Sequence, residues 1–359
     1  MRALLDLHHL GRRQTGNETW ARSIASRLLA TPGDDEYDVV VTDAAGDTAH
    51  DFPARTTSTV SGNSARRLVQ DMPRLIRTLG SDVVLVQYSM PLTSVPCVVA
   101  VHDLSFEDPR AAQWLPLSTR LRYRATIRAS VNRAAHVLAL SQHTRADLIQ
   151  HYDLAPDRVS VVYAAADPAL VRLITTTPER RVHGQVLAVG NVLPRKNLLV
   201  VGRAVRALRD QGHPLTLAVI GSVPDEGRPV AAELERLLAD AVSFSGYVTP
   251  AQLAVAYRTA SVLAYPSLYE GFGIPLLEAM AANLPVVCSD ASCLPEVAGD
   301  AALVVPAQDT EAWSVAIAEV LGLEATRARL SAAGRHRSGD FSWDDSAARV
   351  RDRLLDAAR

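Results

Sequence analysis

The pattern that most constrains this chain is a repeated alternation between two kinds of segment. Short runs of β-branched apolar residues are separated by longer amphipathic stretches. This pattern is typical of parallel strands joined by crossover helices, because strands covered on both faces are apolar along their whole length. We therefore predict an α/β fold. The expected strands span residues 3–7, 37–41, 82–87, 96–101, 136–141, 158–163, 185–190, 215–221, 242–246, 261–266, 285–289 and 302–306.

The alternation lapses once, over residues 164–181, and then starts again. A chain of 359 residues, 48% of them apolar, can also bury a sizeable core and exceeds the usual size of one domain. We therefore predict one domain over residues 1–178 and a second over residues 179–338. Each is expected to be doubly wound and Rossmann-like, the two facing each other across a cleft, with ligands outside the carboxyl ends of the strands.

Charge and composition exclude several classes of protein. Lys and Arg number 37 against 39 Asp and Glu, so a net charge of -2 gives no basic field for nucleic acid as a main partner. No stretch approaches the roughly 20 apolar residues of a membrane-spanning helix. The N-terminal apolar run is broken by Asp6, His8 and His9, unlike a signal peptide. We expect a soluble cytoplasmic protein, and peripheral contact with the inner face of a membrane stays open.

A glycine loop follows the expected strand at residues 261–266 and precedes a helix. Gly271 and Gly273 allow the backbone to approach a ligand closely, and the free amides at the helix start favour a phosphate. Glu270 lies before the helix and Glu278 lies one turn inside it. A carboxylate accepts paired hydrogen bonds from vicinal hydroxyls of a ribose or hexose. The segment therefore predicts a phosphate-and-ribose site; the alternative is an ordinary βαβ turn with a buried glutamate cap.

The same residues resemble a known family. The segment EGFGIPLLEAMAANLPVVCSD, with PSLYEGFG before it and LPEVAGDAALVV after it, is similar to the signature of family 4 of the retaining glycosyltransferases. The resemblance implies the GT-B fold and retention at the anomeric carbon. It implies that Glu270 approaches the donor sugar, that Glu278 holds the ribose hydroxyls, and that the backbone between them meets the diphosphate and sugar. The donor-binding residues of that backbone segment are Gly271, Phe272, Gly273, Ile274 and Leu276.

A second match is GNVLPRKNLLVVGRAV at residues 190–205. A lysine at a helix start beside a glycine turn can neutralise a diphosphate as its bond to the sugar breaks, so we expect Lys196 to be catalytic. The family often has an arginine directly after the glycine, but this chain has Asn191 there, and Arg195 adjoins Lys196 instead. We therefore take Arg195 as a second catalytic candidate. The alternative is a solvated lysine at a helix start.

Matches in the N-terminal half are weaker. His102 and Asp103 end a strand in AVHDLSFED, which resembles the family's histidine that contacts the donor sugar or its leaving oxygen; we expect Asp103 to orient the ring. The alternative is a polar pair that merely ends a strand. Gly16 precedes a helix in LGRRQTGNETWARSI and resembles the family's glycine-rich loop beneath the diphosphate. There the alternative is a helix cap with Asn17 as the N-cap residue.

Two further segments resemble the family. SFSGYVTPAQL is similar to its base-contacting turn, which implies that Tyr247 and Val248 offer backbone groups to the base of the donor. Thr249 and Gln252 next to it form a capping box, so we expect a helix to begin there. The tail at residues 339–359 resembles the family's closing helix, which packs back toward the N-terminal domain.

We therefore expect a hexosyltransferase that uses a nucleotide-diphosphate sugar. The resemblance is greatest to mannosyltransferase-like members, so GDP-mannose is the first choice of donor and a UDP-hexose the second; the acceptor is a hydroxyl of a glycan, a lipid-linked or a small-molecule acceptor. With no Asp-x-Asp motif in a setting that requires a metal, we predict activity without a metal or other cofactor. The alternatives are a nucleotide-sugar 2-epimerase and a non-catalytic sugar-nucleotide-binding subunit. The sequence leaves the oligomeric state open.

Overall fold

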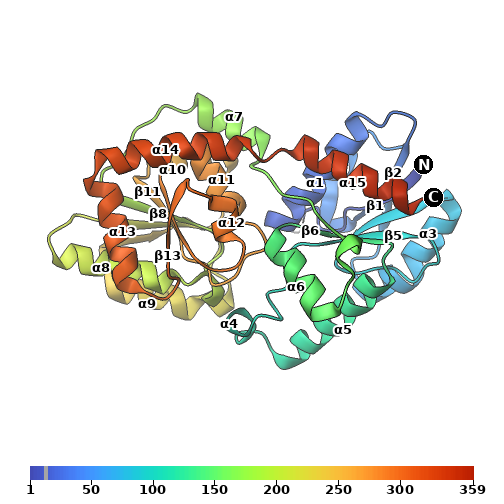
Figure 1. Cartoon of the computed structure of the whole chain (residues 1–359), viewed down its shortest axis with the longest axis horizontal. Coiled ribbons are helices and arrows are strands. Elements are labelled where there is room, and N and C mark those ends of the chain that lie inside the picture. Colours follow the sequence, from blue (N-terminus) through green and yellow to red (C-terminus); the bar gives the residue numbers. More distant parts are fainter. Residues whose placement is uncertain (12–14) are drawn as a thin grey trace. The chain divides into compact units, whose positions relative to one another are not determined.

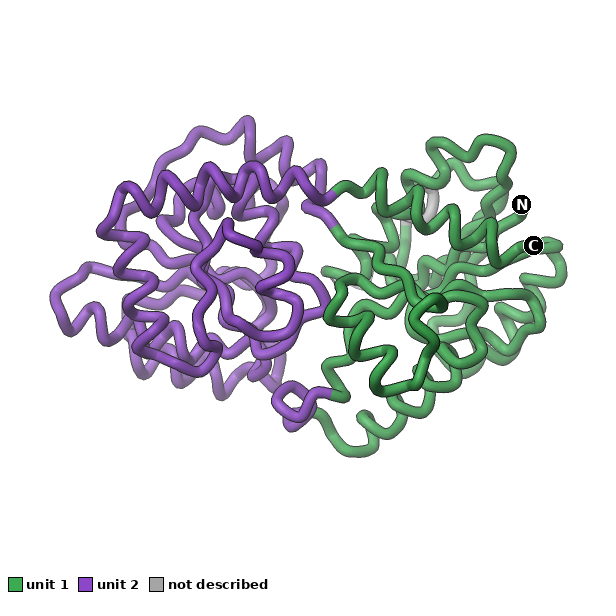
Figure 2. Tube along the Cα trace, in the orientation of Figure 1, with its two compact units in different colours: residues 1–107, 115–164, 342–359 green, residues 108–114, 165–341 purple. Residues whose placement is uncertain are grey.

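The computed structural model describes residues 1–11 and 15–359. The chain forms two compact units, which Figure 2 shows in different colours. Unit 1 comprises residues 1–107, 115–164 and 342–359, and unit 2 comprises residues 108–114 and 165–341. Each unit contains one parallel sheet with helices packed on it, so the predicted α/β class with two doubly wound domains is confirmed.

The sheet of unit 1 has seven parallel strands in the order β3-β2-β1-β4-β5-β6-β7. These are β1 (Arg2–Asp6), β2 (Glu36–Thr42), β3 (Thr56–Val60), β4 (Val83–Gln87), β5 (Cys97–Val101), β6 (His136–Ala139) and β7 (Val159–Val161). Six of them were predicted. The sequence analysis missed β3 because its residues, TTSTV, form a partly exposed edge strand without the apolar run that marks the buried strands.

Helices cover both faces of this sheet. The helices of unit 1 are α1 (Thr15–Ala30), α2 (Ser64–Arg66), α3 (Met72–Leu79), α5 (Leu117–Arg133), α6 (Gln142–Tyr152) and α15 (Trp343–Ala357). On one face, Ile76 of α3, Ile127 of α5 and Leu148 of α6 join the buried core. Helix α15 packs against α1, as Figure 1 shows, and also contacts β4, β5 and β6. The Ser346 hydroxyl fixes it further by donating to the Tyr163 carbonyl at 2.6 Å.

The sheet of unit 2 has six parallel strands in the order β10-β9-β8-β11-β12-β13. These are β8 (Gln185–Val189), β9 (Thr216–Ile220), β10 (Val242–Phe244), β11 (Val262–Tyr265), β12 (Val286–Ser289) and β13 (Ala302–Val305), all of them predicted. The helices are α4 (Pro109–Ala112), α7 (Pro168–Thr176), α8 (Leu198–Asp210), α9 (Arg228–Leu238), α10 (Pro250–Thr259), α11 (Ile274–Ala281), α12 (Leu294–Ala298), α13 (Thr310–Gly322) and α14 (Glu324–Gly339). Helices α8, α9 and α13 share one buried core with the sheet.

The main segment of unit 2 begins at Ala165, ahead of the sequence-based boundary between residues 178 and 179. The physical reason is helix α7, which lies in the segment where the strand pattern lapses. Its buried residues are Leu170 and Ile174, and it packs against α10 and α11 of unit 2. Within the described residues, no helix combines the length and the apolar composition of a membrane-spanning segment.

The predicted capping box at the start of α10 is confirmed. The backbone N–H of Gln252 donates to the Thr249 hydroxyl at 3.3 Å, and the side-chain Oε1 of Gln252 accepts from the backbone N–H of Thr249 at 2.9 Å. Changing Thr249 to alanine should cost about 1 kcal/mol of local stability, and hydrogen–deuterium exchange of the Gln252 amide should become about five-fold faster. Thr175→Ala serves as the control, because its exposed hydroxyl bonds only a carbonyl within α7. Unchanged exchange in Thr249→Ala would contradict the capping role.

Candidate functional site

Three glycines bring the carboxyl ends of β8, β9 and β10 close together in unit 2. Gly190 follows β8 and Gly221 follows β9, with φ angles of 134° and 147°. A Cβ atom on Gly221 would lie 2.2 Å from the Gly190 carbonyl oxygen, so only glycine fits there. The Gly221 amide donates to the Gly246 carbonyl at 2.9 Å. This close backbone packing leaves room above β8 for the side chain of Lys196.

Lys196 lies at the end of a short helical turn, Pro194–Lys196, between β8 and α8. Its side chain is only 13% exposed. Its Nζ donates to Glu270 Oε1 at 2.5 Å and to the Tyr265 hydroxyl at 3.3 Å. The turn is held by Asn197, whose side-chain amide donates to the Pro266 carbonyl at 3.2 Å and to the Ala307 carbonyl at 2.6 Å. The alternative of a solvated lysine is therefore wrong.

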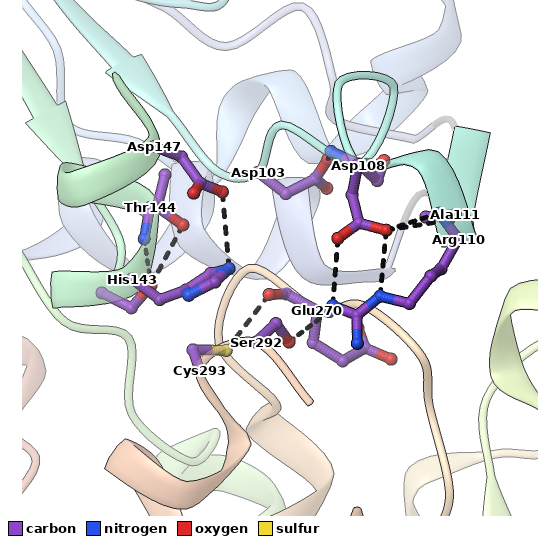
Figure 3. A network of polar contacts seen from close by, with 12 residues as sticks. Asp103, Asp108, Arg110, Ala111, His143, Thr144, Asp147, Glu270, Ser292 and Cys293 are labelled. Carbon is purple, nitrogen blue, oxygen red and sulfur yellow. Dashed lines mark hydrogen bonds and ion pairs between the residues drawn. The ribbon is translucent and has the colours of Figure 1, made fainter. Parts of the chain in front are cut away.

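Glu270 follows β11 and carries the negative charge of this group. Burial opposes its ionisation, but the positive charges of Lys196 and Arg195 outweigh burial and lower the pKa of Glu270. Arg195 Nη1 lies 3.7 Å from Glu270 Oε2. As Figure 3 shows, the Glu270 amide donates to Ser292 Oγ, and the Cys293 thiol donates to the Glu270 carbonyl. Two cations and one carboxylate leave one excess positive charge, which suits an anionic ligand.

The glycine loop ends where α11 begins, at Ile274 as predicted. Gly273 is its N-cap residue with a φ of 104°, and among the described residues no side chain caps this helix start. A Cβ atom on Gly273 would lie 3.0 Å from Leu294 Cδ2. The side chains of Phe272 and Leu276 are buried in unit 2, so they can offer a ligand only their backbone. The loop thus presents backbone amides at a helix start, as an anion requires.

Glu278 belongs to a separate group of side chains, one turn further along α11. It is 8% exposed, and the Tyr257 hydroxyl of α10 donates to its Oε2 at 2.7 Å. Burial raises the pKa of Glu278 to about 7, and the charge of Asp167 adds to this shift, whereas the Tyr257 hydrogen bond opposes it. A ribose hydroxyl that reaches this carboxyl therefore meets a group that ionises near neutral pH.

His102 lies in unit 1, directly after β5. Its ring is 3% exposed and packs edge-on to Trp20 and parallel to Tyr88, with centroid distances of 5.2 and 5.4 Å. Burial, and then the charge of His9, lower its pKa well below 6.5, so the ring is neutral at neutral pH. The expectation that Asp103 orients this ring is wrong. Asp103 Oδ1 instead accepts from the amide and the hydroxyl of Ser105, at 3.0 and 2.8 Å.

The remaining predicted positions are dispersed. Gly16 was expected in a loop before a helix, but it lies in the first turn of α1, because that helix begins at Thr15; Asn17 is therefore inside the helix and is not its N-cap. Residues 12–14 of the same segment lie outside the described part of the chain. Tyr247, 67% exposed, and the half-buried Val248 lie between β10 and α10.

Asn191, which stands where the family often has arginine, has a structural role. Its Oδ1 accepts from the Ser222 amide at 3.2 Å and from the Ser222 hydroxyl at 2.8 Å. These bonds join the loop after β8 to the loop after β9. Arg195, further along the same loop, carries a positive charge, and its Nη1 also donates to the Tyr269 carbonyl at 3.2 Å.

Sequence reasoning missed two tyrosines, Tyr257 and Tyr265, that bond the predicted glutamates and lysine. Their roles depend on how α10, α11 and β11 pack, which no local motif shows. One compositional signal was also missed. Lys196 is the single lysine among the 37 Lys and Arg residues of the chain, which sets it apart from every other basic position.

Within residues 1–11 and 15–359, no group of three His, Cys, Asp or Glu side chains is placed to hold a metal ion.

Comparisons with protein families match both halves of the chain. Residues 179–337 match the model of "Glycosyl transferases group 1", and residues 16–170 match "Glycosyltransferase Family 4". The chain is 32% identical to O-antigen chain mannosyltransferase B of Escherichia coli, over 69% of this chain and 67% of that protein. It is 33% identical to D-inositol 3-phosphate glycosyltransferase of Corynebacterium glutamicum, over 62% of this chain but only 58% of the relative's length.

Solved structures share the fold over nearly the whole chain. Sucrose-phosphate synthase from Thermosynechococcus elongatus superposes with a TM-score of 0.77 at 22% identity, covering 100% of this chain and 99% of that one. WaaG, a glycosyltransferase involved in lipopolysaccharide biosynthesis, gives a TM-score of 0.71 at 18% identity, with 99% of each chain covered. Together with the family matches and the two parallel-sheet units, these findings show that the chain is a GT-B glycosyltransferase and belongs to glycosyltransferase family 4.

Proposed function

We propose that this glycosyltransferase transfers a hexose from a nucleotide-diphosphate sugar with retention at the anomeric carbon. The observation that carries the proposal is the group of Lys196, Arg195 and Glu270 in unit 2, which has an excess positive charge. Helix α11 begins directly after the loop that follows Glu270, and no side chain of the described residues caps its start. A diphosphate gains negative charge as its bond to the sugar breaks, and preorganised positive groups stabilise that charge.

The proposed roles follow from this arrangement. Lys196, assisted by Arg195, stabilises the departing diphosphate together with the backbone of residues 271–276. Glu270 approaches the donor sugar and holds Lys196 in place. Glu278 accepts hydrogen bonds from the ribose hydroxyls. By the family resemblance, the backbone at Tyr247 and Val248 meets the base, Gly16 contributes to donor binding, and the neutral His102 is a further catalytic candidate.

GDP-mannose is the first donor that we propose, and a UDP-hexose the second. Several relatives are named as mannosyltransferases, among them the Escherichia coli protein and the MMP alpha-(1->4)-mannosyltransferase of Mycolicibacterium hassiacum, 30% identical over 71% of this chain and 64% of that protein. A UDP-hexose is supported by the fold likeness to Anabaena HepE in complex with UDP-glucose, with a TM-score of 0.73. The names of the relatives favour a glycan or inositol-phosphate hydroxyl as the acceptor.

We also propose a cytoplasmic enzyme that makes peripheral contact with a membrane. Helix α5 of unit 1 supports the contact, because Leu117 and Leu121, one turn apart, are 65% and 53% exposed. The helix carries five arginines and no acidic residue. Exposed apolar side chains among cationic ones suit the interface of an anionic bilayer.

The role of Lys196 is tested by a pair of substitutions. Lys196→Met removes the charge, and Lys196→Arg keeps it on a larger, planar group. A Cβ atom on Gly190 would lie 3.6 Å from Lys196 Nζ, so a guanidinium has little room. We expect both variants to lower kcat by about 10² to 10³. The control is Arg206→Lys on α8, an exposed residue paired with Asp210, which should keep wild-type kcat. Wild-type kcat in Lys196→Arg would show that charge alone suffices.

The donor is tested by thermal shift with GDP, UDP, ADP and dTDP. A ligand that binds the folded state raises the melting temperature, so we expect selective stabilisation by GDP. Transfer is then followed with the matching nucleotide sugar, and the anomeric configuration of the product is read by NMR. Selective stabilisation by UDP would replace the first choice of donor with the second. An inverted anomer would overturn retention, and a 2-epimer of the donor without transfer would overturn the transferase proposal.

Metal independence is a separate prediction. Lys196 and Arg195 supply positive charge where a divalent cation would otherwise stabilise the leaving diphosphate. We therefore expect kcat to stay within about two-fold of its untreated value after exhaustive treatment with a chelator. Loss of activity that magnesium or manganese restores would show that the two side chains are insufficient.

A further inference from the structure

Tyr257 is a buried tyrosine that the donor-site motifs do not include. It lies in the last turn of α10, its side chain is fully buried, and its hydroxyl donates to Glu278 Oε2 at 2.7 Å. This bond links α10 to α11. A hydroxyl in this geometry donates to a carboxylate and fixes the orientation of the carboxylate plane.

The backbone around this pair is clamped by Arg181. Its Nη1 donates to the carbonyls of Tyr257 and Ala260, at 2.6 and 2.9 Å, and its Nη2 donates to the Ala282 carbonyl at 2.8 Å. One guanidinium therefore holds the end of α10 and the end of α11 together. Arg258 adds a longer bond to the same Ala282 carbonyl, at 3.4 Å. Tyr257 and Glu278 are thus held in place by these main-chain contacts as well as by the hydrogen bond between them.

The ionisation of Glu278 depends on its neighbours. Burial raises its pKa, and Asp167, the N-cap residue of α7, raises it further. The Tyr257 hydrogen bond acts in the opposite direction and favours the carboxylate. Among the described residues, further charged or titratable groups near the pair include Tyr265 on β11, which interacts with Tyr257. Arg181 and Arg258 bond main-chain carbonyls, and both form ion pairs with Glu179.

We propose that Tyr257 is a positioning residue for the donor. Its hydroxyl donates to one oxygen of Glu278 and fixes the plane of the carboxyl group, so that Glu278 is oriented to accept the hydrogen bonds of the ribose hydroxyls. This inference rests on the proposed donor site, in which Glu278 holds the ribose. Tyr257 itself touches neither the sugar nor the breaking bond, so its removal changes how tightly the donor is bound and not how fast it reacts.

The test measures the dissociation constants of GDP-mannose and UDP-glucose by calorimetry between about pH 5.5 and 8.5. Both groups of a nucleotide sugar's diphosphate stay ionised over this range, so the pH dependence reports on the protein. In the wild type, affinity should rise with pH through about 7, because a carboxylate accepts from two hydroxyls and a carboxylic acid does so less well. Glu278→Gln should remove this dependence.

Tyr257→Phe should shift the midpoint of the pH dependence upward by about one unit, because a hydrogen bond to a charged group is lost. At pH 7 the donor should bind about five-fold more weakly, because the ionised fraction of Glu278 falls from about one half to about one eleventh, whereas kcat at saturating donor stays unchanged. Asp167→Asn keeps a capping side chain but removes the charge, so it should shift the midpoint downward. A general loss of stability would not shift the midpoint upward in Tyr257→Phe and downward in Asp167→Asn.

Tyr152→Phe is the matched control. Tyr152 is also buried, and its hydroxyl donates to Glu107 at 3.1 Å in unit 1, so the same kind of bond is lost away from the donor site. It should leave the pH profile unchanged. A wild-type profile in Tyr257→Phe, with the dependence abolished in Glu278→Gln, overturns the inference and leaves the donor site intact. A profile that Glu278→Gln does not alter overturns the ribose role, and with it the inference. Absence of binding by either nucleotide sugar overturns the proposed function itself.

Discussion

The ion pair between Lys196 and Glu270 is the interaction on which the candidate site in unit 2 depends. Removing one partner of a buried ion pair leaves an uncompensated charge and lowers the folding stability by about 3–5 kcal/mol, so the burial of each residue depends on the other. Arg195 and the Tyr265 hydroxyl share the pair, and the Ser292 hydroxyl and the Cys293 thiol fix the backbone of Glu270. The ion pair and its backbone are therefore held by four further residues, Arg195, Tyr265, Ser292 and Cys293.

The parallel sheet explains why this centre forms where it does. The carboxyl ends of β8, β9 and β11 meet at one edge of the sheet, which is where parallel α/β sheets bind ligands. Gly190 and Gly221 let two of these loops pack backbone against backbone, and Asn191 joins them through Ser222. The two loops are thus joined beneath the Lys196 side chain, whose ammonium group is held by Glu270 and Tyr265. Side chains that are held in place before a ligand arrives lose little entropy when it binds.

Much of this arrangement follows from the sequence, for physical reasons that differ between elements. The buried strands were predictable because their apolar runs reflect burial on both faces, and the helix at Ile274 because glycine and proline mark its start. Strand β3 was not, because an edge strand can be polar. The bond of Tyr257 to Glu278 depends on how α10 packs against α11, whereas Asp103 bonds Ser105, two residues away in the same loop. The placement of Gly16 failed because the helix extends to Thr15, beyond the position where a cap was expected.

A chain with one lysine has an unusual consequence for chemistry directed at amines. Every other basic position in these 359 residues is an arginine or a histidine, whose side chains carry no primary amine. Reductive methylation with a ¹³C label therefore places its only side-chain methyl groups on Lys196. The α-amino group of Met1 is methylated as well, so a comparison with Lys196→Met identifies the Lys196 signal, which reports on the ion pair with Glu270. Because the chain has a single lysine, the charged centre can be followed by NMR through one labelled side chain.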